Sequence, residues 1–156
     1  AYKLGYTILS FVGLALIVWG FGWYRASGWI NVWTPPVWTR HLSLTLMLIS
    51  VIALVAAYLR GYIWRFLKHP MLVSVKIWAL AHLLANGDWA SVILFGGLLI
   101  YAVLYIALGF KNGVWPTPEV RDGHDALSLL AGLALYGVMT QLHVVVTGVP
   151  VLTLIK

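Results

Sequence analysis

The sequence predicts an all-α fold, a polytopic transmembrane helical bundle with about five spans plus one short interfacial helix. Of its 156 residues, 62% are hydrophobic and 9% are charged, whereas soluble domains carry about 25% charged residues. Trp and Tyr gather near the ends of the apolar segments, as in an interfacial aromatic belt. Four segments reach or approach the ~20 apolar residues that cross a bilayer, namely Tyr6–Trp23, Leu42–Leu59, Trp89–Leu108 and Ala126–Val146. We therefore expect one membrane domain over residues 1–156, with the lipid bilayer as its partner.

The first spanning helix is expected over residues 4–24. The connection that follows contains Gly28, Pro35 and Pro36, and residues of these types stop helices. Three tryptophan side chains in this connection predict that it folds back into the membrane interface. Thr39 or Arg40 should then begin a second helix that continues to Tyr58.

Residues 60–68, RGYIWRFLK, form a basic and amphipathic stretch that is too short to span a bilayer. Such a segment is expected to lie in the plane of the headgroups. Pro70 suits the first turn of the next helix, where its missing N–H costs nothing, so His69 should lie at that helix's start. The helix should end near Ala85.

Asn86 and Gly87 predict the stop of the third spanning helix. Asp88 is the expected N-cap of the fourth, which should run to about Leu108. Residues 110–125 hold three of the four acidic residues and should form a surface loop. A fifth helix is expected over residues 125–143, and Gly148 and Pro150 should break the helix in the tail.

Charge and composition narrow the possible partners and chemistry. The net charge is +6, but the cations are scattered and form no dense patch, so a nucleic-acid partner is not expected. No cysteine is present, which excludes disulfides and thiol catalysis. The positive-inside rule places the chain start in the cytoplasm, because Lys3, Arg60, Arg65, Lys68, Lys111 and Arg121 outnumber Arg25, Arg40 and Lys156 on the other side.

The third helix holds an unusual number of ionisable residues for an apolar segment. Lys76 and His82 lie within it, and His69 and Asp88 lie at its ends. An ionisable group inside a bilayer costs roughly 2.5–3.5 kcal/mol, so it usually faces a partner or a site. His69 and Lys76 should share one helix face, whereas His82 should point to a different one. The spacing of the two histidines matches no zinc signature.

Histidine is the main candidate for chemistry, since neither a nucleophile elbow nor a Gly-rich phosphate loop is present. Neutral histidines in helix bundles are ligands of b-type haem. The candidate cofactor-binding residues are His82, His143, His41 and His69, with His82 as the metal ligand, while His124 reads as a solvated loop residue. Each of these residues also has a purely structural interpretation. A lone buried histidine is more often a structural residue than a ligand, and Asp88 is most simply a helix cap. The aliphatic stem of Lys76 could let its ammonium group reach water.

The segment KHPMLVSVKIWALAHLLANGDWASVILFGG resembles the signature of the NnrU family. These are bacterial membrane proteins linked to denitrification, and they are related to the zeta-carotene isomerase of plants and algae. The resemblance extends over nearly the whole chain, including VWTPPVWTRHLSLTLM and LHVVVTGVPV. It implies an integral protein of the bacterial inner membrane.

The resemblance also implies haem b. The isomerase relatives hold haem through a histidine in the segment that matches WALAH, which is His82 here. Their proposed alternative cysteine ligand matches Ala79, so that ligand switch is absent. Their second histidine lies in a helix upstream of the first residue here, and this chain is expected to lack that helix. His41 or His143 would replace it, because both are expected at the membrane depth of His82.

Two other classes of function compete with a haem protein that transfers electrons or isomerises a polyene. One is a non-catalytic subunit or assembly factor of a membrane respiratory complex. Its basis is the set of small residues that allow close helix contact, namely Gly96, Gly97, Gly132 and Gly137. The other is an isoprenylcysteine methyltransferase type of enzyme, whose members also carry an Arg/Lys-His-Pro motif. It fares poorly because no acidic and aromatic cofactor segment follows.

Overall fold

The computed structural model describes residues 2–28, 30–115 and 119–151. Within these residues the chain is helical and contains no strand, so the predicted fold class is confirmed. The helices are α1 (Tyr2–Ala26), α2 (Val37–Ala56), α3 (Tyr62–Leu67), α4 (Pro70–Ala85), α5 (Trp89–Asn112) and α6 (His124–Thr147). Four of them, α1, α2, α5 and α6, are long and apolar enough to cross a membrane.

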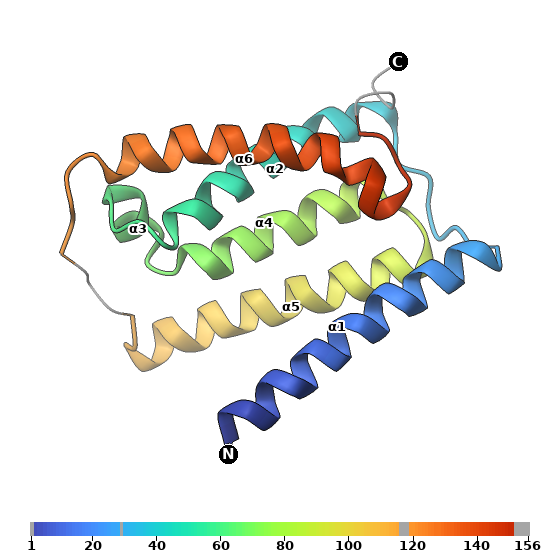
Figure 1. Ribbon diagram of the computed structural model, residues 1–156, viewed down its shortest axis with the longest axis horizontal. Helices are drawn as coiled ribbons and strands as arrows, with labels where there is room; N and C mark the ends of the chain where they lie inside the picture. The colour runs from blue at the N-terminus through green and yellow to red at the C-terminus, as the bar shows by residue number, and fades with distance from the viewer. Residues whose placement is uncertain (1, 29, 116–118, 152–156) are drawn as a thin grey trace.

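The helices form a row rather than a closed ring. α2 packs on both α4 and α6, and α5 packs on α4, so the order across the molecule is α6, α2, α4, α5 (Figure 1). α4 has 16 residues, about 24 Å of helix at ~1.5 Å per residue. It is therefore shorter than its neighbours, and the expectation of about five spans counts it with the four long helices.

The contact between α2 and α4 is close because both helices present small side chains. Ala53, Ala56 and Ala79 are almost fully buried. Ser50 donates a hydrogen bond from Oγ to the Ser74 carbonyl across the interface, at 2.9 Å. This bond satisfies a buried hydroxyl, which would otherwise carry a desolvation cost. Small and hydrogen-bonding residues are the usual material of membrane helix interfaces.

α6 joins the row by two local features. Gly132 faces Ile52 of α2 so closely that a Cβ there would lie 2.8 Å from the Ile52 Cγ1 atom. Near the start of α6, the Asp125 carboxylate accepts hydrogen bonds from the backbone N–H groups of Tyr62 and Ile63, each at 2.8 Å. Asp125 thereby caps α3, which has no side-chain cap of its own.

Several boundaries differ from those expected from sequence, including the start of α2 at Val37 and the end of α6 at Thr147. α5 continues to Asn112, past Leu108, and ends where Gly113 adopts a left-handed conformation with φ +63. His124 is the first residue of α6 rather than a solvated loop residue, and its Nδ1 accepts the Arg60 N–H at 3.1 Å. The end of α5 differs because the C-cap at Gly113, rather than the polarity of the residues, decides where this helix stops.

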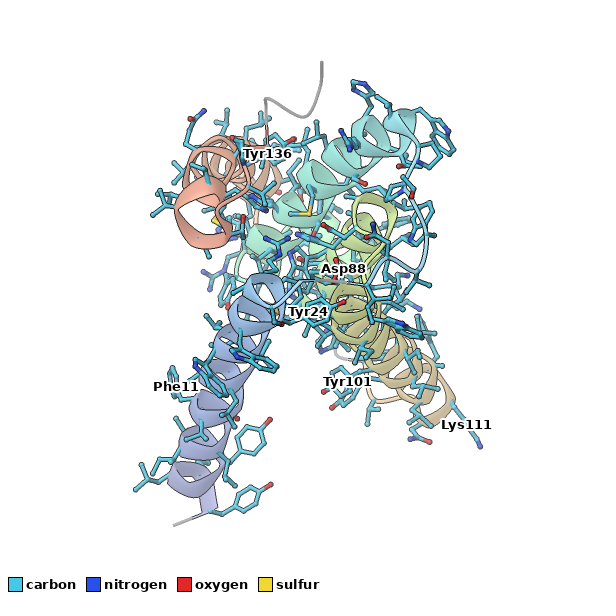
Figure 2. The ribbon with its side chains drawn as sticks, turned by 90° about the vertical axis from the view of Figure 1, so that its right-hand side faces the viewer. Phe11, Tyr24, Asp88, Tyr101, Lys111 and Tyr136 are labelled. Carbon is cyan, nitrogen blue, oxygen red and sulfur yellow. The ribbon has the colours of Figure 1, made fainter. Side chains whose placement is uncertain are left out.

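α1 diverges from the row. It contains no buried residue, and it leaves the other helices at an angle to α5, with Tyr24 and Asp88 near the point of divergence (Figure 2). The connection after it was expected to lie in the interface. It docks on the turn between α4 and α5, where the Gly87 carbonyl accepts the N–H groups of Val32 and Trp33, and its place at the membrane interface stays a prediction.

Candidate functional site

The residues that make the segment from His69 to Asp88 unusual are used mainly to cap helices. At the start of α4, Nδ1 of His69 accepts the Leu72 N–H at 3.3 Å, and Pro70 occupies the first helical position. His69 is therefore the N-cap of α4, as its position before Pro70 predicts. Its ring also meets Trp115 edge-on, with 5.1 Å between ring centroids.

Asn86, Gly87 and Asp88 also have structural roles. Asn86 donates from Nδ2 to the His82 carbonyl at 2.9 Å and so closes the last turn of α4. A Cβ at Gly87 would collide with the Trp33 carbonyl, so only glycine fits beneath the docked connection. Asp88 accepts the N–H of Ser91 at 3.0 Å and its Oγ–H at 2.6 Å, which confirms Asp88 as the N-cap of α5.

The His82 side chain caps no helix, and its environment suits a histidine that binds a metal. Nδ1 lies 2.9 Å from the Trp78 carbonyl oxygen. A carbonyl can only accept, so Nδ1 carries the proton and the neutral ring presents its lone pair at Nε2. The ring stacks on Phe95 with 4.5 Å between centroids and an interplanar angle of 26°. A carbonyl partner at the far nitrogen is the usual support for a metal-ligating histidine.

His143, in α6, also has its Nδ1 at a backbone carbonyl. This Nδ1 is 2.8 Å from the Val149 carbonyl and 3.0 Å from Oγ1 of Thr147, so in the neutral ring Nε2 would again carry the lone pair. These two histidines lie on α4 and α6, 61 positions apart in the sequence, and each has its Nδ1 at a backbone carbonyl.

The remaining candidate residues are placed differently. His41 is exposed near the start of α2. His69 lies at the opposite end of α4 from His82. Lys76 is half-buried, and among the described residues no hydrogen bond or ion pair to it is present. No group of three or more His, Asp or Glu side chains that could hold a bare metal ion occurs in the described part of the chain.

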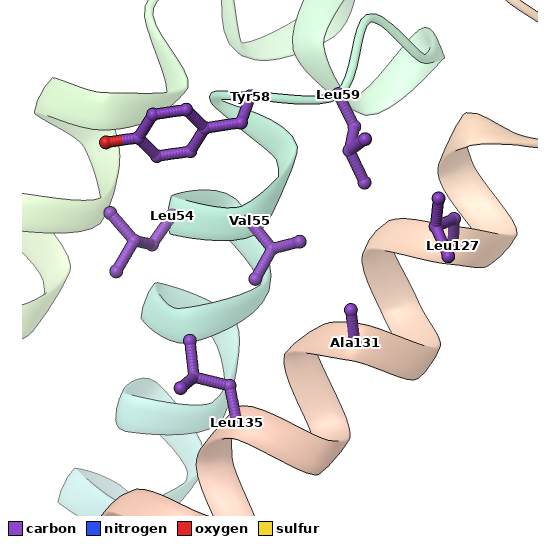
Figure 3. Close-up of a pocket in the computed structure, with 7 residues that line it drawn as sticks. All are labelled: Leu54, Val55, Tyr58, Leu59, Leu127, Ala131 and Leu135. Atoms are coloured by element: carbon purple, nitrogen blue, oxygen red, sulfur yellow. The ribbon is translucent and has the colours of Figure 1, made fainter.

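Two pockets include neither His82 nor His143. The larger, about 460 Å³, is an apolar groove between α2 and α6 (Figure 3). It offers no ionisable group apart from the Tyr58 phenol, so its chemistry is that of a surface for hydrocarbon. The second, about 330 Å³, lies where the start of α4 meets α5 and includes His69.

Comparison with protein families decides what the chain is. The model of the family described as NnrU protein matches residues 1–151. The chain belongs to the NnrU family. Searches of curated proteins and of solved structures found no match to this NnrU protein. Its four long apolar helices make it an integral membrane protein.

Sequence reasoning did not find the supporting groups of the NnrU histidines. Trp78 is four residues before His82, and at this spacing a side chain on a helix can meet the preceding carbonyl. This contact could have been predicted from the sequence. The contacts of Phe95 with His82 and of Val149 with His143 could not be predicted from the sequence. Phe95 reaches His82 from another helix, and Val149 reaches His143 only because Gly148 turns the chain with φ +72.

Proposed function

We propose that this NnrU protein binds b-type haem, and that His82 and His143 would hold its iron. The observation that carries the proposal is that two histidines from different helices each have Nδ1 held by a backbone carbonyl. In the neutral rings this leaves the lone pair on Nε2 for a metal. Haem iron needs two such nitrogens and no third side chain. The donor set therefore fits haem better than it fits zinc, whose sites take three or four protein ligands.

The surroundings of His82 support a macrocycle more than a solvated ion. Phe95 and Trp78 lie against the imidazole, with centroid distances of 4.5 and 4.8 Å. Apolar and aromatic walls suit the flat, hydrophobic face of a porphyrin. Their low polarity also influences the reduction potential of the haem iron. When bound, haem supplies one-electron transfer. The protein's own residues hold the ring nitrogens in a fixed tautomer and exclude water from the stacked face.

The role we assign is respiratory redox chemistry, in line with the link between the NnrU family and denitrification. Polyene isomerisation is the weaker form of the proposal. Ala79, at the position of the relatives' proposed cysteine ligand, is fully buried and offers no thiol. We place the protein in a bacterial inner membrane with the chain start in the cytoplasm, since basic residues predominate on that side.

The experiment is a reduced-minus-oxidised spectrum of the protein purified in detergent from haem-replete cells. We expect a Soret shift and an α band, with low-spin iron from two imidazoles. His82→Ala should lose most of the haem. His143→Ala should leave a five-coordinate, high-spin fraction, whereas His41→Ala should keep the low-spin spectrum because His41 is exposed. His124→Ala is the matched control, because its imidazole is also half-buried but its Nδ1 is taken by Arg60.

A haem-free and folded protein would contradict the proposal. It would favour the second candidate, a non-catalytic subunit or assembly factor of a respiratory complex. One observation favours that candidate: a Cβ at Gly96, Gly97 or Gly137 would meet nothing within 4 Å, so these small residues are available to a helix of another protein. Co-purification with an oxidoreductase would support it.

A further inference from the structure

A second site lies at the opposite end of α4 from His82. It is a pocket of about 330 Å³ where α3, α4 and α5 converge with the end of α2 and the segment after α5. We call it the Lys68–His69 pocket. Its walls are mainly aromatic and apolar, and they comprise Ala57, Trp64, Pro70, Met71, Tyr105, Val114 and Trp115 beside Lys68 and His69.

Two adjacent residues give this pocket a polar end. Nδ1 of His69 accepts the Leu72 N–H, so the neutral ring carries its proton on Nε2 and has a donor to offer. Lys68 adds an ammonium group, whose Nζ lies 4.9 Å from the centroid of the Phe110 ring. A cation beside an N–H donor is the combination that binds a phosphate oxygen.

The backbone of Lys68 is held in an unfavourable conformation. Its φ is +60 and ψ is −41, and it is the only non-glycine residue with positive φ in the described part of the chain. The His69 N–H donates to the Leu67 carbonyl at 2.6 Å, so residues 67–69 form a tight γ-turn. Glycine would adopt this conformation without strain. Lys68 therefore has an unfavourable backbone conformation, and its side chain lines the pocket.

Another wall of the pocket is formed by the chain that turns back at the end of α5. Gly113 reverses the chain with φ +63, and the Trp115 ring then lies against Gly109, where a Cβ would collide with it. This returns Trp115 to the His69 ring. The pocket is thus preformed, with hydrocarbon walls and a cationic mouth on the side of the membrane where basic residues predominate.

We propose that the Lys68–His69 pocket binds the phosphodiester headgroup of an anionic phospholipid. The phosphate oxygens would accept hydrogen bonds from Lys68 and His69, and the glycerol and first acyl carbons would lie against the aromatic walls. Charge complementarity and the amphiphilic lining both select an anionic lipid over a zwitterionic one. This inference is independent of haem, because neither His82 nor His143 lines the pocket.

The test titrates the full chain, purified in detergent, with dioctanoyl phosphatidylglycerol, dioctanoyl phosphatidylcholine or inorganic phosphate, with binding read by native mass spectrometry. We expect saturable binding of phosphatidylglycerol, weaker binding of phosphatidylcholine, and no competition from equimolar phosphate. Lys68→Gly should raise the melting temperature, since it relieves the positive φ, and weaken phosphatidylglycerol binding about fivefold. Lys111→Ala, which removes an exposed cation from the last turn of α5, is the matched control and should change it little.

His69 is tested by two replacements that can still cap α4. Asn and Asp are both good N-caps, so His69→Asn and His69→Asp should fold. His69→Asp should bind phosphatidylglycerol more weakly than His69→Asn, because it presents a negative charge to the phosphate. Equal affinities for the two lipids, unchanged binding by Lys68→Gly and His69→Asp, or displacement by inorganic phosphate alone would each overturn the proposal.

Discussion

Gly61 lies directly against the carboxylate of Asp125, so a Cβ at position 61 would collide with it. That carboxylate caps α3 by accepting the N–H groups of Tyr62 and Ile63. A second backbone bond, from the Arg121 N–H to the Arg60 carbonyl at 2.8 Å, closes the same junction. α3 contains six residues, too few to be stable alone. Its position therefore depends on this contact with α6.

The first prediction tests the pairing of Gly61 with Asp125. Gly61→Ala should displace the carboxylate and destabilise the protein by about 1–3 kcal/mol, within the range for loss of a cap or a buried bond. Asp125→Ala should cost a similar amount for the same reason. The double variant should cost much less than the sum. Thermal unfolding in detergent measures all three, and full additivity would show that the two residues act separately.

The second prediction compares two glycines of α6. Gly132→Ala should destabilise the protein, because the new Cβ would lie 2.8–3.0 Å from Ile52 and push α2 away. Gly137 has open space around its Cα, so Gly137→Ala should be neutral or stabilise the helix by up to about 1 kcal/mol. The melting temperature of Gly132→Ala should therefore be clearly lower than that of Gly137→Ala. Equal shifts would contradict the close contact of α2 with α6.

The third prediction concerns the docked connection between α1 and α2. Gly87→Ala should displace the Trp33 carbonyl and break the bonds from Val32 and Trp33 to the Gly87 carbonyl, which measure 2.7 and 3.2 Å. Amide hydrogen exchange at Val32 and Trp33 should then accelerate, while exchange in the α2–α4 core stays slow. Gly96→Ala is the control, since its Cβ would meet nothing. Unchanged protection at Val32 would contradict the docking.

The fourth prediction concerns the cap of α5. Asp88→Ala removes the acceptor of the Ser91 N–H and Oγ–H and should cost about 1 kcal/mol or somewhat more, because Ser91 is fully buried and its hydroxyl would be left without this partner. Asp88→Asn should retain most of the stability, since its amide oxygen still accepts the N–H. Thermal unfolding distinguishes the two variants, and equal losses would mean that the carboxylate charge is what matters.

The glycines show which helix contacts could not be predicted from the sequence. Gly96, Gly97, Gly132 and Gly137 look equivalent as sites of close helix contact. Only Gly132 among them touches a neighbouring helix, at Ile52. For Gly132 and Gly137, the rotation of α6 about its axis decides this. That rotation depends on partners such as Leu44, whose carbonyl accepts the Tyr136 hydroxyl at 3.2 Å.

The sequence by itself determined the helical membrane fold, because apolar length and local breakers act within one segment. It also determined the cap at Asp88, whose partner lies three residues away, and the place of His69 at the start of α4. Only the tertiary structure decided the stacking of His82 on Phe95 and the contact of Gly61 with Asp125, since each joins residues from different elements of the fold. Helix packing brings such residues together, and no local pattern in the sequence records which faces of two helices will meet.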